Sequence, residues 1–179
     1  RMLDSLKPKI ALLTGAVMDD PVIHARTKGV GILTPEVIRK YGAVGPTARA
    51  SGIAIDVRRD DPYAAYGMVN WNVITAEEGD VFAKAKVRLL EMVESVSIIE
   101  QCLTGLEKTK EGDTETVVRE IPPGMGFGRA EAPRGEVFHF VRSDGSNMPV
   151  RHKIRAPSYV NIATFKESCI GQTVSDATI

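Results

Sequence analysis

The longest regular pattern of apolar positions in this chain runs from about residue 80 to residue 105. Apolar side chains recur there every three or four residues, a spacing that places them on one face of an α-helix. The positions are Phe82, Ala85, Leu89, Met92, Val93, Val96, Ile99, Leu103 and Leu106. The pattern predicts a core helix about 40 Å long.

Shorter helices are predicted upstream of it. Residues 3–18 favour a helix that ends before Asp19 and Asp20. Thr34 is a good N-cap, with a proline at the first helical position and a stop at Gly42. Another short helical stretch is expected after Gly45-Pro46, and residues 52–72 are expected to be irregular.

The pattern changes after residue 118, where strand-like segments appear. Two apolar-rich runs, Val137–Val141 and Val150–Ile154, flank Asp144-Gly145, which is a strong hairpin signal. We therefore predict an antiparallel hairpin from about 136 to 155. The glycines of the segment 124–128 predict a turn that brings backbone close to this hairpin. The polar residues 105–118 predict a flexible linker.

Together these elements predict a mainly α fold of the α+β class. It is a helical bundle around one long helix with a small antiparallel β-hairpin, in a single domain over residues 1–179. With 43% hydrophobic residues, the chain can bury a core.

Charge and composition exclude some functions. Twenty-three basic residues balance 23 acidic ones, so no bulk field favours nucleic acid. No apolar run approaches the roughly 20 residues of a membrane span, and no signal-peptide pattern is present. The two cysteines indicate no disulfide framework.

The two outer ends of the predicted hairpin carry the candidate site. A hairpin brings its ends together, so Pro133-Arg134 and Pro157-Ser158 should lie close in space. They would supply one guanidinium, one hydroxyl and two prolines that fix the backbone. An ordinary surface hairpin with prolines at its strand ends is the alternative interpretation.

Several ordered motifs resemble one protein family. The chain has Glu-Ala-Pro-Arg-Gly-Glu at 131–136, Asp-Gly-Ser-Asn at 144–147 and Lys-Ile-Arg-Ala-Pro-Ser-Tyr-Val-Asn at 153–161. Upstream motifs at 26–34, 45–52, 60–63 and 98–103 follow in the same order. The set resembles the large subunits of membrane-bound, energy-converting [NiFe] hydrogenases and the related 49 kDa quinone-site subunit of respiratory complex I.

The resemblance implies roles at matching positions. Arg134 would be the catalytic arginine whose guanidinium lies over the open position of the NiFe centre. The residues that would bind the cofactor by packing around the iron's diatomic ligands are Pro133, Ala156, Pro157 and Ser158. Arg49 lies in a motif shared by both branches, and a structural role for it is favoured over one in conduction.

The metal ligands themselves are not expected in this chain. The family holds nickel and iron with two Cys-x-x-Cys-type pairs, whereas this chain has only Cys102 and Cys169. We therefore expect a central fragment that binds no NiFe centre and is inactive alone, the cysteine ligands of the parent lying outside it. The alternative is a parent that lost the cysteines, as the resemblance implies for the complex I relatives. His139 and His152 could be cross-strand neighbours, but no carboxylate or thiolate spacing completes a zinc site, so no metal ligand is predicted.

Three functions remain open. Arg134, Ser158 and Asn161 favour the catalytic subunit of a membrane-bound hydrogenase, in which proton reduction or H2 oxidation is coupled to electron transfer. The alternatives are a 49 kDa-type quinone-site subunit of a complex I-like NADH dehydrogenase and a non-catalytic scaffold. The resemblance implies an iron–sulfur small subunit and membrane subunits as partners, with the chain peripheral at the cytoplasmic face of the membrane. Alone, the chain is expected to self-associate through uncovered apolar surface.

Overall fold

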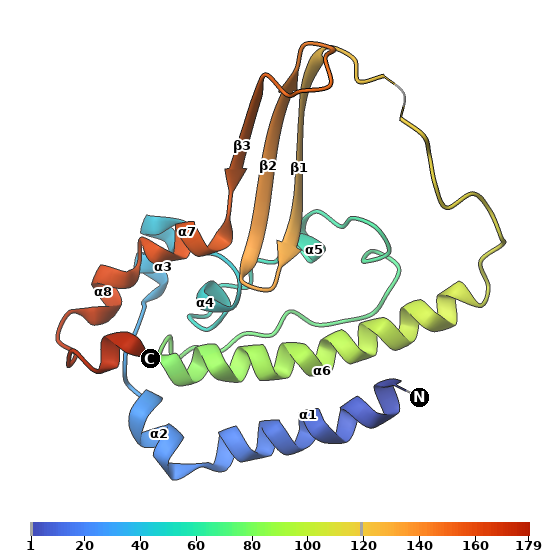
Figure 1. Ribbon diagram of the computed structural model, residues 1–179. Helices are drawn as coiled ribbons and strands as arrows, with labels where there is room; N and C mark the ends of the chain where they lie inside the picture. The colour runs from blue at the N-terminus through green and yellow to red at the C-terminus, as the bar shows by residue number, and fades with distance from the viewer. Residues whose placement is uncertain (1, 119) are drawn as a thin grey trace.

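Helices and one small sheet make up the protein, in a computed structural model that describes residues 2–118 and 120–179. Figure 1 shows α1 (Met2–Asp19) running alongside the long helix α6 (Val81–Leu106), with the sheet projecting from the helical body. This is the predicted α+β class, and α6 confirms the helix expected at 80–105.

Helix starts follow the expected chemistry. Proline occupies the first position of α2 (Pro21–Thr27), α3 (Pro35–Tyr41), α4 (Pro46–Arg49) and α7 (Pro157–Ile162). Its fixed φ and missing N–H suit that position. The Thr34 side chain accepts a hydrogen bond from the Val37 backbone, and Gly42 ends α3 in the left-handed conformation, as predicted.

The region predicted to be irregular contains a short helix, α5 (Val57–Asp60). The Asp56 side chain caps it by accepting a hydrogen bond from the Arg58 backbone N–H. Beyond α7, the chain ends in α8 (Phe165–Cys169) and the 3-10 helix η1 (Asp176–Thr178), neither of which was predicted.

The sheet has three antiparallel strands in the order β1 (Gly124–Ala132), β2 (Gly135–Ser143) and β3 (Arg151–Arg155). Strands β2 and β3 confirm the predicted hairpin. The glycine-rich segment predicted as a turn is instead the first half of β1, which pairs with β2 from Gly124↔Ser143 to Ala132↔Gly135. The actual turn between β1 and β2 consists of Pro133 and Arg134.

One part of the core lies under the amino-terminal half of α6, and a second cluster of buried apolar residues lies around α3 and α4. On α6, Phe82, Ala83 and Val87 are buried. One apolar cluster brings Ala83 and Val87 together with Ala50 and Ala76. The far end of the predicted apolar stripe is uncovered, since Ile99, Leu103 and Leu106 are exposed. Self-association through such surface stays a prediction.

The linker was predicted over residues 105–118, but Gly105 and Leu106 still belong to α6, and residues 110–118 carry no helix or strand. The flexibility of this segment stays a prediction. Among the described residues, no helix combines the length and apolar character needed to cross a membrane.

Candidate functional site

Arg49 is the centre of a buried ion network. Its side chain is almost inaccessible to solvent, with the whole residue 1% exposed. Its Nε donates to Glu91 Oε1 at 2.7 Å, and its Nη1 donates to Glu131 Oε1 at 3.0 Å. The same Nη1 lies 3.2 Å from Asp56 Oδ2 and donates to the Ile55 carbonyl at 3.0 Å. A guanidinium is suited to this role because its donors are arranged in a rigid plane.

Arg58 extends the network from α5. Its Nε and Nη2 donate to the two oxygens of Asp56, at 2.9 and 2.6 Å, in a two-pronged pair. The guanidinium also stacks on the Trp71 ring at 4.6 Å from the ring centre. Asp56 is therefore shared by two arginines and is itself buried, 1% exposed.

The network joins segments far apart in the sequence. Arg49 comes from α4, Asp56 caps α5, Glu91 lies on α6 and Glu131 lies at the end of β1. The Tyr63 hydroxyl adds a contact by accepting a hydrogen bond from the Glu131 backbone N–H at 3.0 Å. The carboxyl-terminal end of β1, and with it the turn that follows, is thus tied to the helical body.

Glu131 is a buried carboxyl of this network, its side chain 5% exposed. Burial raises the pKa of its carboxyl, and the positive charge of Arg49 opposes part of that increase. Two guanidiniums face three carboxylates here, so the network has one more acid than base when all groups are ionised.

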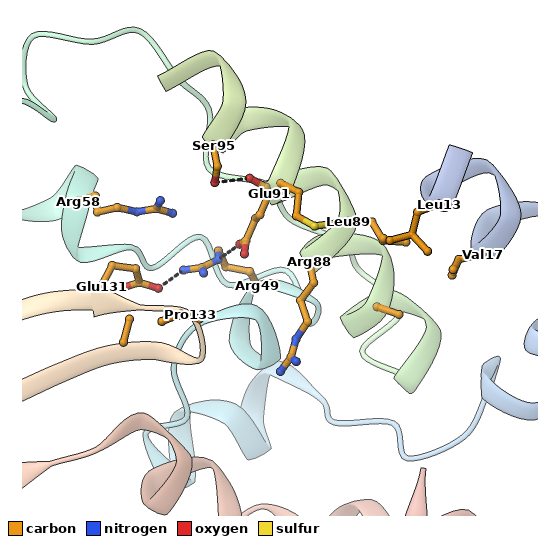
Figure 2. A pocket seen from close by; sticks show the side chains of 13 residues that line it. Leu13, Val17, Arg49, Arg58, Arg88, Leu89, Glu91, Ser95, Glu131 and Pro133 are labelled. Carbon is orange, nitrogen blue, oxygen red and sulfur yellow. Dashed lines mark hydrogen bonds and ion pairs between the residues drawn. The ribbon is translucent and has the colours of Figure 1, made fainter. Parts of the chain in front are cut away.

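A cavity of about 700 Å³ opens beside the network. Figure 2 shows Arg49 between Glu91 and Glu131, with Leu13 and Val17 of α1 on the far side of α6. The cavity lining combines this ionic wall with Arg88 and Pro133 and with apolar side chains, namely Leu13, Val17, Ala85, Leu89 and Met92. Such a lining suits an amphipathic ligand with a polar head and an apolar body.

Two smaller cavities meet at Lys84 on α6. One, of about 260 Å³, is also lined by Thr47, Ser158 and Asn161, and the other, of about 360 Å³, is also lined by Arg88. Burial lowers the pKa of Lys84 to about 8, and the charge of Asp80 opposes part of that change. Its Nζ donates to the Gly31 carbonyl at 2.9 Å.

The residues predicted from the hairpin ends are brought near one another but divide between cavities. Pro133 lines the large cavity, whereas Ser158 lines a smaller one. Arg134 is exposed to solvent, as expected for an always-charged side chain. Ala156 precedes α7 as its N-cap, and Pro157 is buried at the first position of that helix. Their catalytic and cofactor-binding roles stay predictions.

Asn161 on α7 joins the two ends. Its Nδ2 donates to the carbonyls of Arg134 at 3.3 Å and Val44 at 3.1 Å, and its Oδ1 accepts from the Val44 backbone N–H at 2.9 Å. From the sequence, Asn161 was interpreted only as a residue that distinguishes the hydrogenase branch of the family from the 49 kDa branch. In the structure, its side chain connects the β1–β2 turn, α7 and the segment before α4.

The acidic members of the network were not identified from the sequence as a site. Glu131 was considered only as a possible carboxylate partner for Arg134, whereas the structure pairs it with Arg49. Glu91 was not singled out from the polar residues of the long helix. Arg49 was interpreted as structural, and its burial among three carboxylates supports that interpretation. In the described part of the chain, no group of three or more His, Cys, Asp or Glu side chains is placed to hold a metal ion.

Comparison with known proteins gives a consistent family. The family model described as "Respiratory-chain NADH dehydrogenase, 49 Kd subunit" matches residues 1–120 and 114–179. The chain is 38% identical to a subunit of the F(420)H(2) dehydrogenase of Methanosarcina mazei, over 98% of this chain and 48% of that protein. It is 41% identical to a subunit of the NADH-quinone oxidoreductase of Clostridium beijerinckii, over 90% and 44% respectively.

A hydrogenase is also among the relatives. The carbon monoxide-induced hydrogenase of Rhodospirillum rubrum is 36% identical over 97% of this chain and 48% of that protein. In each comparison the chain spans about half the length of the curated relative it matches.

Proposed function

The chain belongs to the family of the 49 kDa subunit of respiratory-chain NADH dehydrogenase, and on that basis we propose that it is part of a 49 kDa-type subunit in a quinone-reducing oxidoreductase complex. The observation that carries this proposal is the family match over essentially the whole chain, together with relatives named as NADH-quinone oxidoreductase subunits. This function replaces the hydrogenase as the favoured one, because more of the relatives compared are named as NADH-quinone oxidoreductase subunits than as hydrogenases.

The buried network supports a specific task in such a subunit. It fixes the end of β1, and Pro133 and Arg134 follow that end directly. Arg134 would present a permanent positive charge to the partner or acceptor that faces this turn, and a fixed charge stabilises negative charge that develops during electron transfer. Glu131, in contact with the large cavity, would hold a proton close to the same turn.

A membrane-bound hydrogenase is the second candidate. It is favoured by the identity to the carbon monoxide-induced hydrogenase and by Arg134, Ser158 and Asn161. The donor set of this chain does not fit the NiFe centre that such an enzyme uses, because four thiolates are needed and the chain has only Cys102 on α6 and Cys169 on α8. In a hydrogenase parent, the thiolates would therefore come from outside these 179 residues.

The proposed partners follow from the same family. We expect the parent subunit to bind an iron–sulfur small subunit and to attach through further subunits to the cytoplasmic face of the membrane. Pro133, Ala156 and Ser158 would then form a surface against a redox partner or cofactor rather than a complete site within this chain, with the buried Pro157 fixing the start of α7 behind that surface.

The parent gene offers an inexpensive test. A quinone-reducing subunit of this family should carry neither Cys-x-x-Cys-type pair upstream or downstream of these residues, since thiolates serve to hold nickel and iron. Sequencing the complete open reading frame measures this directly. Both pairs in the reading frame would instead support the hydrogenase.

A further inference from the structure

His139 on β2 and His152 on β3 form a close pair on one face of the sheet. The Nδ1 atom of His139 and the Nε2 atom of His152 are 2.9 Å apart, and the ring centres are 5.1 Å apart. The register explains the contact. His139 pairs with Ile154 and His152 pairs with Val141, so the two histidines are diagonal neighbours on the same face.

The pair is partly open to solvent, since His152 is exposed and His139 is half-buried. On the neighbouring strand, Gly128 lies opposite His139 and Gly126 lies opposite Val141. A Cβ atom at either glycine would meet nothing within 4 Å, so these two positions leave the rings uncovered on the β1 side. The basic residues of β3 alternate with His152 and Ile154 and therefore project from the opposite face; they are Arg151, Lys153 and Arg155.

We propose that His139 and His152 form a two-imidazole site for a late divalent transition metal such as Cu²⁺ or Ni²⁺, with water completing the coordination. Zinc was not expected from the sequence because a closed zinc site requires further protein ligands. Water can take those positions here, since the face beside the rings is open.

The separation of the nitrogens is close to that of two neighbouring ligands on one metal ion. Two nitrogens bound at right angles to one metal at about 2.05 Å lie about 2.9 Å apart, whereas tetrahedral zinc would hold them about 3.3 Å apart. Without metal, the 2.9 Å contact is an N–H···N hydrogen bond, so one of the two nitrogens carries a proton that the ion would replace. The same distance is close to that between neighbouring positions of a square-planar or tetragonal ion. Each imidazole would carry its remaining proton on its other ring nitrogen, so small ring rotations and a tautomer change are sufficient.

The site would join β2 to β3 in the projecting sheet, on residues that take no part in the Arg49 network. It does not depend on the proposed function of the parent subunit. Binding there should reduce opening of the hairpin, because the ion binds both histidines only when the strands are paired.

Titration with Cu²⁺ alone, followed by electron paramagnetic resonance, tests the proposal. The 179-residue chain should be used with Cys102→Ser and Cys169→Ser, since free thiols reduce Cu²⁺, and circular dichroism should confirm its folding. We expect one Cu²⁺ per chain, with hyperfine structure from two imidazole nitrogens. His139→Ala and His152→Ala should each weaken binding by roughly 100-fold, because each removes one arm of a chelate.

The control is His24→Gln, which removes the third histidine, on α2, and should leave Cu²⁺ affinity unchanged. The proposal is overturned if Cu²⁺ does not bind at millimolar concentration. It is equally overturned if either single alanine variant, still folded, binds Cu²⁺ as tightly as the 179-residue chain that keeps both histidines.

Discussion

Arg49→Ala should lower the free energy of unfolding by about 3–5 kcal/mol, because it removes a partner shared by three buried or half-buried carboxylates. Asp56 would keep Arg58, but Glu91 and Glu131 would lose the guanidinium at the network's centre. Leaving such groups unpaired costs more than the pairing itself contributes. Urea denaturation followed by circular dichroism measures the change.

Two further variants sharpen this prediction. Arg49→Lys should recover part of the loss, since an ammonium keeps the charge but cannot reproduce the planar arrangement of donors. Arg39→Ala on α3 is the matched control: that arginine is exposed, and its loss should change stability by less than about 0.5 kcal/mol. An Arg49→Ala chain as stable as the Arg39→Ala chain would show that the network does not hold the fold together.

Gly135→Ala should destabilise the protein by about 3 kcal/mol, through backbone strain and overpacking together. Gly135 has φ of +127°, a conformation that L side chains rarely adopt. A Cβ there would lie 2.7 Å from Val44 Cγ2 and 2.8 Å from the Gly45 nitrogen. Because the close contact of Gly135 with Val44 and Gly45 packs the β1–β2 turn against the helical body, the substitution should also displace Pro133 and Arg134.

The measurement compares the melting temperature of the Gly135→Ala variant with that of a Gly128→Ala control. Gly128 lies in the middle of β1, and a Cβ there would meet nothing within 4 Å. Its substitution should therefore be nearly neutral or slightly stabilising, since alanine restricts the unfolded chain more than glycine does. Equal melting temperatures for the two variants would contradict close packing between the turn and the helical body.

The elements predicted best are those whose signals are local. The three- and four-residue spacing of apolar residues identified α6, and Thr34, Pro35 and Gly42 marked both ends of α3. Asp144-Gly145 identified the β2–β3 connection. In each case the residues that define the element lie within it or beside it, so no distant contact was needed to recognise it.

The features that were missed from the sequence depend on partners far along the chain. Gly124, Gly126 and Gly128 have low strand propensity, and only pairing with β2 makes that segment a strand. Arg49 finds Glu91 42 residues away and Glu131 82 residues away. No local pattern predicts such contacts. The motifs that contain Arg49 and Glu131 were both recognised, but the pairing of these two residues could be found only from the fold.

The most direct test of the assignment to a quinone-reducing complex is to purify the complete parent complex and assay it under anaerobic conditions. Two electron acceptors should be compared, a soluble quinone and protons. We expect electron transfer to a soluble quinone, no H2 evolution from reduced viologen, and no stoichiometric nickel in the metal analysis. An Arg134→Lys complex should keep most of its quinone reduction, since the positive charge remains at the turn. Stoichiometric nickel together with H2 evolution that Arg134→Lys abolishes would contradict the assignment and establish the hydrogenase instead.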